Sequence, residues 1–498
     1  MTDPASPEGL ASRTRRETLQ RLFALAAAGG GALPLLACGA SGGGKNPIVV
    51  PLPSPPPPVT PPPPAPPPPS PAAVLARLKT ALAATPPTVD AMTALTVTQG
   101  TTESASSSFG SGAQFIPPLP QDATSNLSTV AQVYGHLRTL WPQAASSIAG
   151  VAVIPMSIDH EAATLGSRGR IGLHIVHTGS AIELLVRGAN NALTLISDGK
   201  YVGCGDASQP LAQTNTTPST EPLSNVNTTV KFDFGTRATR HLSLYSMASV
   251  GACALIVPAG DTVAAWDRSA EASFAAISDS YGGAPTSVWG WGGLFYQASL
   301  ALAIPHVDLD AIGGTGYAPT STQPDLQLAG NAFDARLASI TESQPDLFVT
   351  AGSLNDNNVR AQAPYATADA AKAGFAAAVS QYYTDLRAKL PNAVLAALGP
   401  WQPPPNLPAA QSELDKAGVI KAALAAAGGH WIFVDNINGG WSNSAGAAGV
   451  PSASDGPWQT VANAAAYIST DNVHPNAVGC AYLAGRLSGA LRAAILAL

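Results

Sequence analysis

Continuous apolar runs alternate with helix-like stretches through the second half of this 498-residue chain. Runs of this kind are typical of parallel strands that are covered on both faces, and the intervening stretches are long enough for helices. We therefore predict a three-layer α/β/α domain with a parallel sheet over residues 269–498, closed by a helix at Ala477–Leu496. The predicted strands are Phe274–Ile277, His306–Ile312, Leu347–Ala351, Ala393–Leu398 and Trp431–Val434, and a further helix is predicted at Ser287–Ala303.

The preceding segment, residues 127–268, has a different pattern. After a possible helix at Ser128–Leu140, short apolar runs are separated by polar turns, which favours an antiparallel β-sandwich. Residues 76–126 are rich in Thr, Ser, Ala and Pro, and we expect much of this segment to be loosely ordered. The apolar runs are Arg170–His177, Ile182–Val186, Leu193–Ile196, Thr229–Phe234, His241–Tyr245 and Ala252–Val257.

The first residues, 1–37, have the composition of an export signal. Arg15-Arg16 precedes a modestly apolar stretch, as in twin-arginine signals, although Thr18 replaces the usual Phe and leaves the general secretory route open. Leu35-Leu36-Ala37-Cys38 matches a bacterial lipobox, so we predict lipid attachment at Cys38. Residues 38–75 then form a proline-rich linker, which favours polyproline II as a spacer; a proline-rich recognition segment is the alternative. We expect an exported protein that is lipid-anchored in the bacterial cell envelope.

Candidate chemistry lies at the ends of the predicted strands. Ser280 follows the first strand, and Asp471 precedes His474 by three positions near the C-terminus. A serine nucleophile needs a base to take its proton and a third group to hold that base in one tautomer. Ser280, His474 and Asp471 can supply these three roles. Dipeptides such as Asp-Ser, Asn-Asp and His-Pro are each more often part of a simple turn. Here each one follows an apolar run.

Two more segments could stabilise the negative charge of an acyl-transfer intermediate. The run 311–317 is rich in glycine, which lets backbone N–H groups approach a developing oxyanion closely. The segment 352–356 follows another predicted strand and carries Asn355, whose amide is a neutral donor. We predict an oxyanion hole made by Gly314, Asn355 and the backbone N–H of Ser280.

These four segments together resemble the SGNH/GDSL hydrolase superfamily, over about residues 270–498. The resemblance implies that Ser280 is the nucleophile, Gly314 and Asn355 are oxyanion donors, His474 is the base and Asp471 is its partner. One position departs from the family's Gly-Asp-Ser, because Ser278 stands in place of the glycine. The layout is also similar to that of two-domain carbohydrate acetylesterases, in which a jelly-roll domain precedes the hydrolase domain.

The composition of the chain limits the classes of partner that we expect. Charged residues make up 11% of the chain, the net charge is −6, and no basic block is present to attract phosphate, so no nucleic-acid partner is expected. No cofactor or metal site is indicated, since His174 and His177 fall on opposite faces of a strand.

Cys204 and Cys253 could pair, whereas Cys480 is expected to be buried. Candidate substrate-binding residues are Trp401, Trp441 and Tyr281. Trp458 lies in a further loop that we expect near the carboxyl ends of the predicted strands.

The sequence thus predicts a serine esterase that removes short acyl groups from carbohydrate, with acetyl as the expected group. One alternative is a lipase or thioesterase of the same superfamily that acts on longer acyl chains. Another is a non-catalytic surface lipoprotein that binds polysaccharide. The sugar, the acyl position, the membrane and the oligomeric state are left open by the sequence.

Overall fold

The structure of the chain is a computed structural model. It describes residues 69–86, 109, 170–187, 192–198, 200–202, 227–247, 251–265, 270–282, 293–304, 307–311, 314–318, 332–341, 344–356, 367–404, 407–449 and 456–498, and the short strands at 89–90, 96–102, 114–116, 147–148, 151–152, 154–155 and 212–213. The export signal, Cys38, Cys204 and the helix predicted at Ser128–Leu140 lie outside these residues.

A seven-stranded sheet organises the C-terminal part, in the order β15-β14-β16-β17-β18-β19-β20. The first five strands in this order are parallel, and β19 and β20 add an antiparallel edge. The parallel strands confirm the predicted α/β class, and their bounds lie within two residues of the predicted ones. The strands are β14 (Phe274–Ser278), β15 (Val307–Ala311), β16 (Leu347–Ala351), β17 (Val394–Leu398), β18 (Trp431–Asp435), β19 (Gly440–Asn443) and β20 (Ala448–Gly449).

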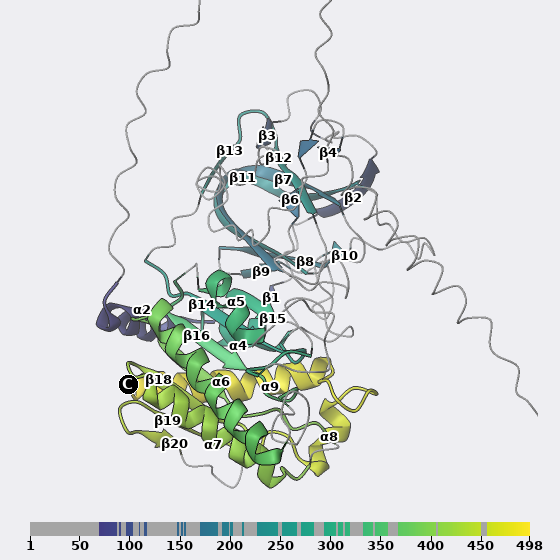
Figure 1. Cartoon of the computed structure of the whole chain (residues 1–498). Helices are drawn as coiled ribbons and strands as arrows, with labels where there is room; N and C mark the ends of the chain where they lie inside the picture. Colours follow the sequence, from purple (N-terminus) through teal and green to yellow (C-terminus); the bar gives the residue numbers. More distant parts are fainter. Residues whose placement is uncertain are drawn as a thin grey trace, which may run out of the picture. The chain divides into compact units, whose positions relative to one another are not determined.

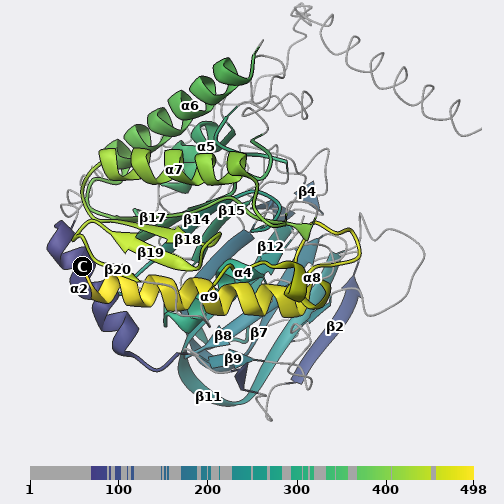
Figure 2. The same cartoon turned by 90° about the horizontal axis from the view of Figure 1, so that it is seen from below.

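Helices cover both faces of this sheet, as Figure 2 shows with α6 and α7 on one side and α9 on the other. Alternate residues of each strand point to opposite faces, so one strand feeds two cores. In β14, Phe274 joins a core with α4 and α9, whereas Ile277 joins a second core with α5, α6 and α7. The helices are α4 (Leu294–Ala301), α5 (Ala332–Ile340), α6 (Ala368–Lys389), α7 (Gln411–Ala426), α8 (Val461–Tyr467) and α9 (Ala477–Leu496).

A helix that the sequence pattern did not predict, α2 (Pro71–Ala83), also belongs to this core. Ser70 caps it, since its side chain accepts a hydrogen bond from the N–H of Ala73, and a proline at the first helical position suits the start of a helix. Its buried face joins the core of α9 through Val74, Leu78 and Leu82. The expected boundary at residue 75 between linker and loosely ordered segment therefore falls inside a packed helix.

The other described sheet is built on two long antiparallel strands, β7 (Arg170–Arg187) and β11 (Asn227–Met247), which lie side by side in Figure 1. We predicted each as two short strands of a sandwich. Instead, the polar residues between the runs stay in the strand, and the pairing shifts register once, between Asp233 and Ala238. Eleven of the described strands form this one hydrogen-bonded sheet, and the predicted sandwich of two packed sheets is not confirmed. The strands that pair directly with β7 or β11 are β2 (Thr96–Thr102), β8 (Ala192–Ser197), β12 (Gly251–Val257) and β13 (Thr262–Ala265). The sheet is extended by β1 (Val89–Asp90), β3 (Gln114–Ile116), β6 (Ile154–Pro155), β9 (Lys200–Val202) and β10 (Ala212–Gln213). A separate small sheet consists of β4 (Ser147–Ile148) and β5 (Val151–Ala152).

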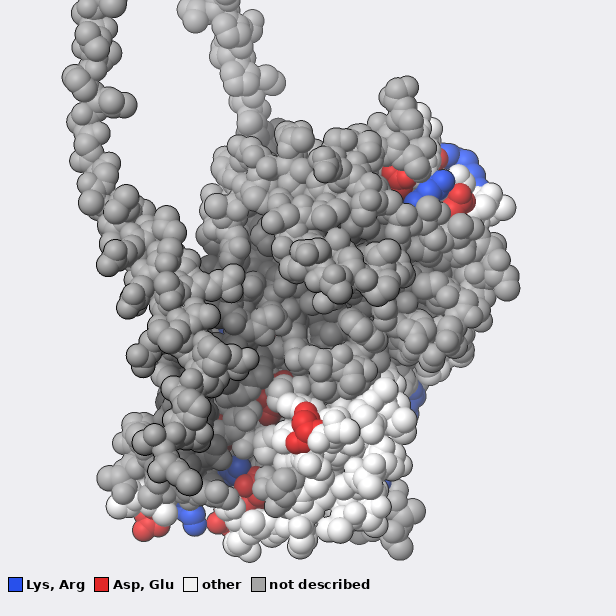
Figure 3. Space-filling view, turned by 90° about the vertical axis from the view of Figure 1, so that its right-hand side faces the viewer, with Lys and Arg blue, Asp and Glu red and all other residues white. Residues whose placement is uncertain are grey.

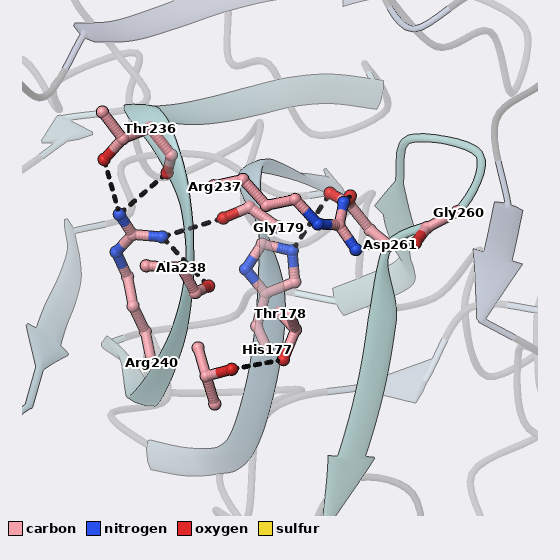
Figure 4. Close-up of polar contacts among 10 residues, drawn as sticks. His177, Thr178, Gly179, Thr236, Arg237, Ala238, Arg240, Gly260 and Asp261 are labelled. Atoms are coloured by element: carbon pink, nitrogen blue, oxygen red, sulfur yellow. Dashed lines mark hydrogen bonds and ion pairs between the residues drawn. The ribbon is translucent and has the colours of Figure 1, made fainter.

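Polar side chains gather at the register shift (Figure 4). His177 is fully buried, with its Nε2 3.4 Å from Oδ2 of Asp261, and Arg237 pairs with the other oxygen of that carboxylate. Arg240 donates to the carbonyl oxygens of Gly179 and Thr236, at 2.8 and 2.9 Å. The arginine therefore bonds a carbonyl oxygen within the irregular stretch, that of Thr236, and one on the facing strand beside it, that of Gly179. Burial lowers the pKa of His177.

Charged side chains on the described part of the surface in Figure 3 occur in small groups of mixed sign, on a largely uncharged background. Cys480 is buried in α9, as expected. Among the described helices, none is long and apolar enough to cross a membrane.

Candidate active site

Strand register brings three of the predicted site segments to one edge of the sheet. Ser278, the last residue of β14, is level with Ala311 of β15 and with Ala351 of β16. Ser280, Gly314 and Asn355 follow these level positions by a few residues each. Because the strands are parallel, their carboxyl ends meet at the same edge, where open α/β sheets place their ligands.

Ser280 lies half-buried in a tight turn directly after β14. The carboxylate of Asp279 accepts the N–H of Tyr281 at 3.0 Å, and the N–H of Gly282 donates to the carbonyl oxygen of Asp279 at 3.1 Å. A Cβ on Gly282 would lie 2.5 Å from the Cβ of Ser278. The missing side chain at Gly282 thus makes room for the side chain of Ser278.

Asp279 is itself fully buried. Its Oδ2 has no hydrogen-bond partner among the described residues. Burial in this environment raises the pKa of the carboxyl to about 7, with the nearby carboxyl of Asp356 adding to the rise, against the N–H bond from Tyr281, which lowers it. The carboxyl group that precedes Ser280 is therefore protonated for part of the time near neutral pH.

His474 and Asp471 form a hydrogen-bonded pair within one turn. Nδ1 of His474 lies 2.7 Å from Oδ2 of Asp471, and Oδ1 of the same carboxylate accepts the N–H groups of Val473 and His474 at 2.9 and 3.0 Å. Asn472 takes φ +58° to close the turn. The carboxylate therefore orients the imidazole with Nδ1 toward Asp471, so Nε2 is the ring nitrogen on the side away from that carboxylate.

Hydrogen bonds also determine the charge of Asp471. Its slight burial raises the pKa, but bonds from the Ser469 hydroxyl, from the His474 ring and from two backbone N–H groups outweigh that effect and hold the pKa well below the usual range of a carboxyl. The Ser469 bond is 2.6 Å long. Asp471 is thus an anion at any pH at which a histidine base is neutral.

The predicted oxyanion donors are tied to one another. Gly314 adopts φ +76°, a conformation that favours glycine, and Nδ2 of Asn355 donates to the carbonyl oxygen of Thr315 at 3.1 Å. A primary amide carries two N–H groups, and this bond uses one of them. The carboxylate of Asp356 accepts the N–H groups of Tyr317 and Ala318, at 3.1 and 2.9 Å, and joins the same two loops.

Sequence reasoning missed Arg336, which lies beneath these loops from α5. Its side chain is buried and donates to Asp310 at 2.5 Å, to the carbonyl oxygen of Ser278 at 3.3 Å and to the hydroxyl of Thr315 at 3.1 Å. It therefore links the ends of β14 and β15 to the glycine-rich loop. No local motif marks this arginine, because its partners come from three separate segments.

Tyr281 was predicted to bind substrate, but its side chain is fully buried. Its ring stacks on Trp401, with centroids 4.7 Å apart and planes 10° apart, and lies 6.1 Å from the ring of His474. Its hydroxyl donates to the carbonyl oxygen of Val473 at 2.6 Å. The residue after Ser280 thus contacts the residue before His474, and these contacts bring the Ser280 and His474 turns together.

The predicted tryptophan walls also need correction. Trp401 and Trp458 are buried, and Trp401 offers one face to Tyr281, so neither ring is open to a sugar. Trp441 lies on β19 rather than in a loop, pairs with Val434 and packs on the core. Four strand positions separate β19 from β14, roughly 19 Å at about 4.8 Å each, which places Trp441 far from Ser280.

No family model and no curated protein matches the chain. Among solved structures, it is similar to a family two carbohydrate esterase from Cellvibrio japonicus, with 12% identity over 81% of this chain and 99% of that one and a TM-score of 0.43. It is also similar to a family two carbohydrate esterase from Clostridium thermocellum in complex with cellohexaose, with 15% identity over 70% and 100% of the two chains and a TM-score of 0.44. A putative GDSL-like lipase from Bacteroides ovatus shows 10% identity over 66% and 84%, with a TM-score of 0.40. Because these identities and TM-scores are low, we base the function on this chain's own residues.

Proposed function

We propose that this protein is a serine esterase that hydrolyses short-chain acyl esters, with acetylated carbohydrate as its substrate class. The observation that supports this most is the pairing of His474 with Asp471 on a turn that Tyr281 joins to the Ser280 turn. Ser280 is half-buried, and the His474 side chain is 27% exposed, so both remain within reach of a substrate.

The reaction is acyl transfer to water. Nε2 of His474 takes the proton of Ser280 as Oγ attacks the ester carbonyl carbon, and Asp471 stabilises the imidazolium that forms. The carbonyl oxygen becomes an oxyanion that accepts hydrogen bonds from the backbone N–H groups of Ser280 and Gly314 and from Nδ2 of Asn355. The intermediate collapses, the alcohol leaves with the proton from His474, and water then hydrolyses the acyl-enzyme by the same steps.

The test is hydrolysis of nitrophenyl esters from acetate to palmitate by the full-length protein, beside Ser280→Ala. We expect activity that is highest on acetate and absent in Ser280→Ala. An optimum on long chains would move the proposal to a lipase. Hydrolysis that survives in Ser280→Ala would overturn the assignment of the nucleophile.

Substrate class needs a second assay, release of acetate from acetylated polysaccharides. Carbohydrate esters are the first class to try because the layout of the sequence is similar to that of two-domain carbohydrate acetylesterases. Retention of polysaccharide by a protein that releases no acetate would instead favour a binding protein.

We also propose that the chain is exported and lipid-anchored through Cys38 in the cell envelope. The lipobox Leu35-Leu36-Ala37-Cys38 supports this. Radiolabelled palmitate fed to bacteria that produce the full chain should be incorporated into wild type and not into Cys38→Ser. Equal labelling of the two proteins would refute the anchor.

A further inference from the structure

Ser280 and His474 lie on segments that are far apart in the sequence, yet proton transfer needs their side chains within hydrogen-bond reach. The bonds of Asp471 hold the His474 turn together internally, since its carboxylate accepts from Ser469, Val473 and His474. They do not connect that turn to Ser280. A separate contact must set the position of the base against the nucleophile.

Among the described hydrogen bonds, the one from the Tyr281 hydroxyl to the Val473 carbonyl makes that connection, at 2.6 Å. Both ends of this bond are held by other contacts, and at the Val473 end the backbone N–H donates to Asp471 at 2.9 Å. The backbone N–H of Tyr281 is held by Asp279, and its ring is stacked on Trp401. Burial raises the pKa of the Tyr281 hydroxyl, which therefore keeps its proton and stays a donor.

Gln459 determines where the hydrogen of that hydroxyl points. Oε1 of Gln459 accepts the backbone N–H of Gln402 at 2.9 Å, which turns Nε2 toward Tyr281, and Nε2 donates to the Tyr281 oxygen at 3.3 Å. A phenol has one hydrogen to donate. Because Gln459 occupies a lone pair of the oxygen, that hydrogen is left for Val473.

We propose that Tyr281 is a positioning residue whose hydroxyl holds the His474 turn against the Ser280 turn, and that Gln459 directs the hydrogen of this hydroxyl. The proposal rests on the proposed serine-hydrolase function. It replaces the predicted role of Tyr281 in substrate binding, because the ring is buried and its hydroxyl is bonded within the protein.

The test measures two rates in the full-length protein, covalent labelling of Ser280 by a small fluorophosphonate and hydrolysis of nitrophenyl acetate. Tyr281→Phe keeps the ring on Trp401 and removes the bond to Val473. We expect both the labelling rate and kcat to fall by about 10- to 100-fold, with KM near wild type, because a small misplacement of a catalytic group costs rate rather than binding. Labelling should still reach every folded molecule at long times.

A second variant, at Gln459, tests whether the direction of the Tyr281 hydroxyl hydrogen matters. Gln459→Glu keeps an oxygen for Gln402 and replaces the donor at Nε2 with an acceptor, which would draw the Tyr281 hydrogen away from Val473. We expect a loss similar to that of Tyr281→Phe, and little further loss when the two are combined, since both break one bond.

The matched control is Tyr383→Phe on α6, which removes another buried tyrosine hydroxyl. That hydroxyl is hydrogen-bonded to the hydroxyl of Tyr317 at 2.7 Å. It should label at the wild-type rate. Wild-type labelling by Tyr281→Phe, or a loss that only follows the folded fraction measured by thermal unfolding, would overturn the positioning role.

The labelling rate also separates the two proposals. A wild type that labels at Ser280 but hydrolyses none of the esters would refute the esterase function, and the labelling rates would still decide the role of Tyr281. A wild type that does not label has no activated serine, and both proposals then fail.

Discussion

The buried carboxyl of Asp279 makes the stability of this protein depend on pH, and Asp279→Asn tests that. Its pKa is raised from 3.8 to about 7 by burial. Between these values the unfolded chain releases a proton that the folded chain keeps, so the contribution of this group is fully present below about pH 4 and is lost as pH rises through about 7. At about 1.4 kcal/mol per pKa unit, the total is about 4 kcal/mol, of which about 3 kcal/mol falls between about pH 5 and about pH 8.

Asparagine is neutral at every pH, has nearly the same shape and keeps an oxygen for the N–H of Tyr281. The assay is urea unfolding of wild type and Asp279→Asn, followed by tryptophan fluorescence and circular dichroism, from about pH 5 to about pH 8. The free energy of unfolding of the variant minus that of wild type should rise across this range by about 3 kcal/mol. Other titrating groups cancel in the difference.

Asp369→Asn, at an exposed carboxylate on α6, is the control for the loss of a carboxyl group. The difference between its curve and that of wild type shows what the loss of an exposed carboxyl group does by itself. A curve for Asp279→Asn that is parallel to that of wild type would refute the reasoning, because it would mean that Asp279 titrates alike in the folded and the unfolded chain.

Three further predictions concern other residues. Asp471→Asn should lower kcat by up to about 10⁴-fold with little change in KM, because the imidazole of His474 loses its orienting acceptor; the steady-state kinetics of acetate ester hydrolysis decide this. Gly316→Ala should destabilise the fold by about 1–3 kcal/mol in urea unfolding, since its Cβ would lie 2.4 Å from Oδ1 of Asp356. Burial lowers the pKa of His177, so the unfolded chain binds more protons below about pH 6.5 and the free energy of unfolding should fall there. His177→Gln should flatten that limb, and an unchanged slope between about pH 7 and about pH 5 would contradict this account.

Much of the α/β part could be predicted from local pattern. Short continuous apolar runs that alternate with longer helix-like stretches are typical of strands buried on both faces, and the parallel strands lie where the sequence indicated. The last helix, α9, also has the predicted bounds. The long strands β7 and β11 were divided wrongly, because Thr, Ser and Gly between two apolar runs usually mark a turn. Arg240 and the register shift let such residues stay in a strand, and those contacts are not local.

The sequence by itself determined which candidate groups are present. These are a serine, a histidine with an aspartate one turn away, and a glycine and an asparagine after strand ends. His474 and Asp471 could be paired because the bond spans one turn. The tertiary structure alone decided which groups support them. Tyr281, Gln459 and Arg336 act through partners from distant segments, and burial of Trp401 or protonation of Asp279 depends on everything packed around them. Desolvation and long-range hydrogen bonds are properties of the packed chain, so no local pattern carries them.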